Sequence, residues 1–122
     1  MKVGNASMKK RIHMDKERKA DYCARLQALL PSLRNRLGMT QSELGLVSGV
    51  SRVTISQLES GRATMNWLHF VALMLVCCEN REAKEVVYAN GLLDRELLCF
   101  LQNTEGETEV NVSVNVEALC DV

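Results

Sequence analysis

Residues 40–61 read TQSELGLVSGVSRVTISQLESG, and they contain the start and stop signals of two short helices. Thr40 offers an N-cap oxygen, and Glu43, three residues later, completes a capping box for a helix over residues 41–47. Gly49 predicts a tight turn after this helix, since glycine takes positive φ without strain.

A second helix is predicted directly after the turn. Ser51 offers the next N-cap and Gly61 provides a stop, so the helix should cover residues 52–60. Gly45 faces this helix, and its small size lets the two backbones approach closely. Apolar contacts between the two helices are expected from Leu44, Val50, Ile55 and Leu58. The second helix should therefore project outward at a fixed angle, a shape that fits the major groove of B-DNA.

The helical period continues on both sides of residues 40–61. A helix should begin at Asp15 or Asp21 and end at Gly38, and Pro31 should either kink it or start a new helix. Residues 67–78 are apolar nearly all round, so this helix is expected at the centre of the core. Two further helices are predicted over residues 82–89 and 94–102. The fold class is therefore mainly α, with five or six helices.

The C-terminal segment differs in kind from the helices. Apolar and polar residues alternate strictly there, which predicts a half-buried β-strand built on Val110, Val112, Val114 and Val116. A lone strand leaves its backbone unpaired, so antiparallel pairing with a second copy is the expected remedy. A docked tail, with dimerisation through helices alone, is the alternative. We thus expect a flexible basic arm at 1–14, a helical domain at 15–103, and a linker with a dimerisation strand at 104–122.

Composition narrows the class of protein. Of 122 residues, 47% are hydrophobic and 25% are charged, which is typical of a globular chain. The sequence predicts no membrane span and no signal peptide, so the expected location is the cytoplasm. The five cysteines form no close CxxC pair, and neither a metal site nor a cofactor is expected.

Charge is divided unevenly along the chain, although the formal net charge is zero. Residues 1–62 hold 12 Lys or Arg and 5 Asp or Glu, whereas residues 63–122 hold 3 and 10. The first half is therefore suited to an anionic partner, and the acidic half is available to a protein partner. The alternative is that the two halves do not segregate in space.

The motif in residues 40–61 resembles the helix-turn-helix of phage repressors and Cro proteins, the Xre-like family. The resemblance rests on Thr40-Gln41, Leu44, Gly49-Val50-Ser51, Ile55-Ser56, Glu59 and Gly61. It implies double-stranded DNA as the partner, a helical repressor-like domain, and a structural ion pair between Arg34 and Glu59. Gly45 departs from the alanine that is usual in the family. The other reading of the motif is a helical pair used only for packing or protein contact.

The resemblance, together with position, assigns the DNA contacts. Bases should be read by Arg52, Val53, Thr54 and Gln57, with Arg52 suited to guanine and Gln57 to adenine. Val53 should meet a thymine methyl group, unless it only shields the motif's core. Phosphates should be bound by Gln41, Ser51, Arg62, Lys9, Lys10 and Arg11.

The expected function is a transcriptional regulator, a repressor, that binds a palindromic operator as a homodimer. The alternative is an antitoxin that also binds its own promoter and holds a basic toxin through its acidic half. No motif of catalysis is present, so we do not expect an enzyme.

Overall fold

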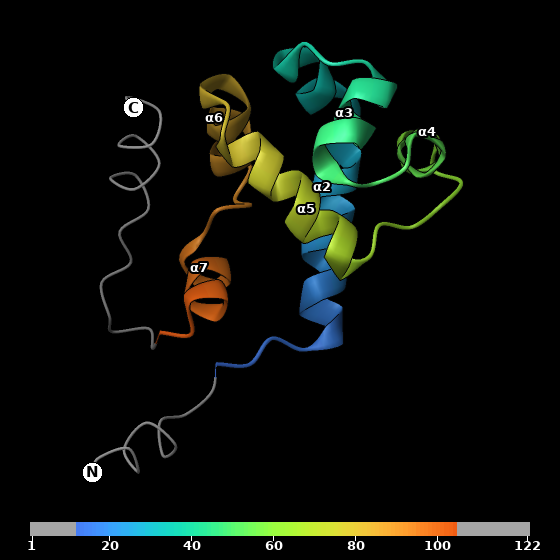
Figure 1. Cartoon of the computed structure of the whole chain (residues 1–122). Helices are drawn as coiled ribbons and strands as arrows, with labels where there is room; N and C mark the ends of the chain where they lie inside the picture. Colours follow the sequence, from blue (N-terminus) through green and yellow to red (C-terminus); the bar gives the residue numbers. More distant parts are fainter. Residues whose placement is uncertain (1–11, 105–122) are drawn as a thin grey trace, which may run out of the picture.

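The computed structural model describes residues 12–104, which contain six helices and no strand (Figure 1). The prediction of a mainly α fold is therefore confirmed for this part of the chain. The helices are α2 (Lys16–Leu37), α3 (Gln41–Ser48), α4 (Arg52–Ser60), α5 (Trp67–Cys78), α6 (Arg81–Ala89) and α7 (Arg95–Gln102). The predicted strand at Val110, Val112, Val114 and Val116 lies outside the described residues.

Helix α2 is the longest element, and local signals explain both of its ends. Asp15 caps its start by accepting a hydrogen bond from the Arg18 N–H at 2.8 Å. Gly38 ends it in the left-handed region at φ 68°. Pro31 lies inside the helix, so the sequence from 16 to 37 forms one element and not two.

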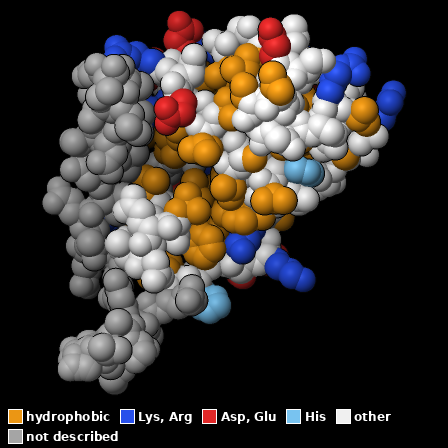
Figure 2. Space-filling view, viewed as in Figure 1, with side chains coloured by type: hydrophobic (Ala, Val, Ile, Leu, Met, Phe, Trp, Pro, Cys, Tyr) orange, Lys and Arg blue, Asp and Glu red, His pale blue; other side chains and the backbone are white. Residues whose placement is uncertain are grey.

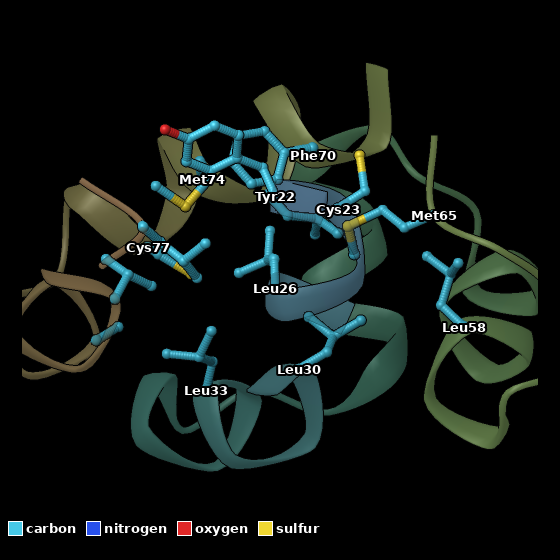
Figure 3. Packing of buried hydrophobic residues seen from close by; sticks show 14 of the residues in the cluster. Tyr22, Cys23, Leu26, Leu30, Leu33, Leu58, Met65, Phe70, Met74 and Cys77 are labelled. Atoms are coloured by element: carbon cyan, nitrogen blue, oxygen red, sulfur yellow. The ribbon is translucent and has the colours of Figure 1, made fainter. Parts of the chain in front are cut away.

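The core lies between α2 and the helices around it. Leu26, Leu30 and Leu33 of α2 are fully buried, and Figure 3 shows them in the middle of the packed side chains. Phe70 and Met74 bring α5 against them, while Leu58 and Met65 approach from α4 and the loop that follows it (Figure 3). Burial of this leucine row, with Tyr22 and Cys23 of the same helix, stabilises α2 against its neighbours.

Helix α5, predicted at the centre of the core, has one face in the core and one exposed face. Its Phe70, Leu73, Met74 and Cys77 side chains are buried, but Leu68, Val71 and Leu75 are 77%, 38% and 66% exposed. Figure 2 shows hydrophobic side chains gathered across the middle of the view, where Figure 1 places α5. Helices α2, α3 and α6 contact α5, and in residues 12–104 they leave this apolar stripe uncovered.

Helix α7 is attached to α2 by polar and aromatic contacts. The Tyr22 hydroxyl donates to Asp94 Oδ1 at 2.6 Å, and Arg18 forms an ion pair with Glu96 at 2.7 Å. Between these helices the Trp67 ring stacks on Phe70 at 4.7 Å and meets Phe100 edge-on at 6.1 Å. The Lys19 ammonium lies 5.4 Å from the Trp67 ring and 5.2 Å from that of Phe100. Cation–π attraction and ring packing therefore join α2, α5 and α7.

The chain is already packed before α2 begins. Met14 is only 7% exposed, and the Ile12 N–H donates to Asn103 Oδ1 at 3.2 Å. Of the predicted arm at 1–14, residues 12–14 are thus held against the helical part. Lys9, Lys10 and Arg11 lie outside the described residues.

The cysteines of residues 12–104 form no disulfide with one another, and three of the four are buried. Within residues 12–104, Cys23, Cys77, Cys78 and Cys99 are free thiols, and burial raises the pKa of Cys77 to about 12. The Cys77 thiol therefore stays protonated at neutral pH. None of the described helices combines the length and the apolar character that crossing a membrane requires.

Candidate nucleic-acid interface

Helices α3 and α4 are joined by a turn whose geometry follows from its glycines. Thr40 and Glu43 form the complete capping box at the start of α3. Gly49 ends the helix at φ 82°, and its N–H donates to the Gly45 carbonyl. A Cβ on Gly45 would lie 2.8 Å from the Val50 carbonyl oxygen, so only glycine fits this approach without a shift of backbone.

Helix α4 has one buried face and one exposed face. Ile55 and Leu58 are buried against the core. Arg52, Val53 and Gln57 are exposed, and Val53 has 59% of its surface accessible although it is apolar. Figure 2 shows Lys and Arg side chains at the right edge of the view, where Figure 1 places α4. The outer face of α4 thus presents a cation, an amide and an apolar group together.

Ser51 and Thr54 are paired with each other at the start of α4. The Ser51 hydroxyl accepts from the Thr54 N–H at 3.1 Å and donates to the Thr54 hydroxyl at 2.9 Å. Thr54 is partly buried, unlike its neighbours Arg52 and Val53. Its hydroxyl therefore helps to hold the N-terminus of α4, and the exposed part of the face is left to residues 52, 53 and 57.

The Glu59 carboxylate joins three helices. Arg34 of α2 donates to it through Nε at 2.7 Å and through Nη2 at 3.1 Å, and Gln41 of α3 donates through Nε2 at 3.0 Å. The side chains of Arg34 and Glu59 are 21% and 9% exposed. Burial tends to raise the pKa of Glu59, but the hydrogen bonds from Arg34 and Gln41 outweigh it, and the net pKa is lowered. The carboxylate thus stays charged and holds α4 to α2 and α3.

A shallow cleft of about 480 Å³ lies between the starts of α3 and α4. It is lined by Arg34, Thr40, Gln41, Ser42 and Arg52. The helix makes its first internal bond from the Leu44 N–H to the Thr40 carbonyl, and the Glu43 N–H is bound to the Thr40 hydroxyl, so the N–H groups of Gln41 and Ser42 have no acceptor within the helix. Arg34 is already bound to Glu59 and to the Met39 carbonyl, so Arg52 and the N-terminus of α3 are the parts of this cleft that favour an anion.

Sequence reasoning missed Gln27, a partly buried residue of α2. Its Nε2 donates to the carbonyls of Leu58 at 2.9 Å and Ala63 at 2.7 Å, and its Oε1 accepts from the Met65 N–H at 3.0 Å. These partners lie on either side of Arg62, which is exposed just after α4. The only sequence signal was a polar residue beside the leucine row of α2.

The sequence was compared with models of known protein families, with curated proteins and with solved structures. A model described as helix-turn-helix matches residues 32–65. These residues are a Cro/C1-type, Xre-like helix-turn-helix domain. A search among curated proteins found no match, and neither did a search among solved structures.

The Cro/C1-type domain includes Arg34, all of α3 and α4, and the loop to Met65. Gln27 lies before it. A helix-turn-helix domain of this type implies DNA binding. Within the domain, α3 exposes Leu46 and Val47, and α4 exposes its outer face. The predicted base-reading and phosphate-binding residues from Gln41 to Arg62 lie on or beside this face, while Lys9, Lys10 and Arg11 are outside the described part of the chain.

Proposed function

We propose that this protein is a sequence-specific transcriptional repressor that binds a palindromic operator as a homodimer. The observation that carries the proposal is α4, which buries Ile55 and Leu58 and exposes Arg52, Val53 and Gln57. A helix used only for packing would keep such long polar side chains away from its contact surface. Repression would follow from occupying DNA that the transcription machinery needs.

In the proposed complex, the exposed face of α4 enters the major groove. The Arg52 guanidinium pairs with the O6 and N7 acceptors of guanine, and the Gln57 amide pairs with adenine. Val53, exposed between them, contacts a thymine methyl group. Thr54 contributes through its methyl group and the end of its hydroxyl, since that hydroxyl also pairs with Ser51.

The DNA backbone is bound around this face. We assign one phosphate to the cleft at the start of α3, where the Gln41 N–H is available while its side-chain amide is bound to Glu59. Ser51 and Arg62 contact phosphates at the two ends of α4. The basic residues Lys9, Lys10 and Arg11 add contacts that depend on salt and not on sequence.

A homodimer would place two α4 helices on successive turns of the major groove, about 34 Å apart. The valine pattern of residues 110–116 supports antiparallel pairing of two C-terminal strands. The exposed stripe of Leu68, Val71 and Leu75 on α5 supports the alternative, a helical interface. We propose the strand as the interface, because its backbone also needs a hydrogen-bonding partner.

An antitoxin is the second candidate function, and the acidity of residues 63–122 favours it. In that case the same α4 would bind the promoter while the acidic half held a small basic protein. A stoichiometric complex with such a partner would support this reading if the partner is inactive in the complex and becomes active when salt dissociates it.

Selection of bound oligonucleotides from a random pool tests the proposed function. We expect a palindrome with half-sites about one helical turn apart. The double variant Arg52→Ala/Gln57→Ala should enrich no such sequence under the same conditions, although it still binds DNA non-specifically. A wild-type selection without a common sequence would contradict sequence-specific binding.

A further inference from the structure

Within residues 12–104, the Gln27 side chain forms its hydrogen bonds with backbone groups at the end of α4 and in the loop beyond it. Its amide donates to the Leu58 and Ala63 carbonyls and accepts from the Met65 N–H, with distances between 2.7 and 3.0 Å. Leu58 lies in the last turn of α4, and its carbonyl accepts from the Gly61 N–H at 3.3 Å as well as from Gln27. Gln27 therefore holds the end of α4 and the path of the following loop at once.

The chemistry of this contact requires a primary amide. Two carbonyls and one N–H face the same side chain, and a primary amide supplies two donors and an acceptor. A carboxylate of the same length would place an oxygen against two carbonyl oxygens, and an ammonium group would have no acceptor for Met65. The residue type is thus matched to its three partners.

A second attachment from α2 reaches α4 at the adjacent residue. Arg34 binds Glu59, and Gln27 binds Leu58. Gln27 and Arg34 lie on one face of α2, about two helical turns and roughly 10 Å apart. Together with the buried Ile55 and Leu58, these two separated attachments fix the angle of α4 relative to α2.

We propose that Gln27 is a positioning residue for DNA recognition, which sets the angle of α4 and the place of Arg62 without touching DNA. This inference rests on the proposed function. Base-edge contacts depend on the placement of the exposed side chains of α4, whereas phosphate contacts carry no direct sequence information. Loss of Gln27 should therefore reduce specificity more than overall affinity.

The experiment compares Gln27→Met with Arg25→Met in the full-length chain. Met has similar length and removes all three hydrogen bonds. Arg25 is a matched control on the same helix, because its side chain also bonds to loop carbonyls, those of Asn90 and Gly91, away from α4. Binding is measured to the selected operator and to a scrambled duplex at equal salt, using the folded concentration of each variant.

For Gln27→Met we expect the ratio of operator to scrambled affinity to fall about tenfold, the scale of one lost base contact. Arg25→Met should keep the wild-type ratio, even though loss of its charge weakens both affinities. Amide hydrogen exchange at Met65 should become faster in Gln27→Met only. If Gln27→Met does not fold, Gln27→Asn replaces it, because its shorter amide cannot reach all three partners.

Two results would overturn the inference. One is an unchanged affinity ratio in the Gln27 variant, and the other is an equal fall in the Arg25 control. Wild-type protein that binds both duplexes equally would instead refute the proposed function, and the assignment of Gln27 would fall with it. Amide hydrogen exchange at Met65 separates these cases, since it reports the hydrogen bond between Met65 and Gln27 in the absence of DNA.

Discussion

At the scale of single residues, Arg52 and Gln57 carry the specificity that we propose. Each projects from the exposed face of α4 and offers a planar group to a base edge. Arg52→Ala should cost about 1 to 3 kcal/mol of operator binding and relax the preference at one base pair in each half-site. Gln57→Ala should act in the same way at a different pair. Titration of labelled operators with single substitutions measures both effects.

Gln102→Ala serves as the control for these variants, because Gln102 is an exposed residue of α7. It should bind the operator as wild type does. Wild-type affinity in both Arg52→Ala and Gln57→Ala would show that another face reads the DNA.

The ion pair between Arg34 and Glu59 makes stability depend on pH. Arg34→Met leaves a nearly buried carboxylate without its cation and should cost about 2 kcal/mol, between the values for exposed and buried pairs. Because folding lowers the pKa of Glu59, the ion pair contributes fully to the free energy of unfolding above about pH 5. This contribution is lost as the pH falls through the lowered pKa of Glu59. Urea unfolding of both proteins at about pH 7 and pH 3 measures the difference.

Arg18→Met is the matched control, since the pair between Arg18 and Glu96 is exposed on both sides. Its effect on the free energy of unfolding should be smaller. A difference between wild type and Arg34→Met that stays constant across this pH range would contradict the role of the Glu59 charge.

At the scale of helices, sequence signals predicted local features well. The capping box of Thr40 and Glu43 and the stop at Gly61 act between residues close in the chain, and the structure places α3 and α4 within a residue of the predicted bounds. The exposed side of α5 was not predictable, because an apolar sequence does not reveal how many neighbours surround a helix. Gln27 was missed because its partners lie more than thirty residues away, and a local sequence pattern does not reveal contacts over that distance.

The crossing of α3 and α4 depends on Gly45. Alanine usually favours a helix by about 1 kcal/mol over glycine. Here its Cβ would lie 2.8 Å from the Val50 carbonyl oxygen and 3.2 Å from the Arg52 nitrogen, and both of these neighbours are backbone atoms. We expect Gly45→Ala to destabilise the protein by about 1 to 2 kcal/mol despite the gain in helix propensity. Thermal and urea unfolding provide the measurement.

Ser42→Ala, in the exposed first turn of the same helix, is the control for Gly45→Ala and should be close to neutral. If Gly45→Ala is the more stable protein, the two helices separate readily enough to admit a methyl group.

At the scale of the whole molecule, the described parts of the basic and acidic halves are joined by an ion pair. Arg18, from the basic half, is bound to Glu96 of the acidic half, so part of the positive charge is neutralised internally. The basic residues that are not neutralised by acidic side chains should carry the electrostatic attraction to DNA. Deleting residues 1–11 should weaken binding to all sequences equally and flatten the salt dependence by about 0.9 log units for each lost phosphate contact.

This deletion keeps Ile12 and Met14, which contact the helical part, so folding should be unaffected. Circular dichroism of the shortened protein checks that point. A salt slope equal to that of wild type would exclude Lys9, Lys10 and Arg11 from the DNA contacts.

Removal of residues 105–122 tests how two copies associate. We expect a folded monomer with much weaker operator binding, because the paired strands would be lost and each α4 would bind a half-site alone. Sedimentation equilibrium at micromolar concentration measures the mass. A shortened protein that remains dimeric would assign the interface to α5, and Leu75→Glu should then dissociate it.

The aromatic contacts at the junction of α2, α5 and α7 give the protein an internal optical probe. Trp67 is the single tryptophan of the chain, and its ring is enclosed by Phe70, Phe100 and the Lys19 ammonium. Its fluorescence therefore depends on α7 remaining in place, since Phe100 is part of that helix. Release of α7 alone would shift the emission to longer wavelength while the leucine row of α2 stayed packed. One emission spectrum can thus distinguish detachment of the last helix from unfolding of the whole domain.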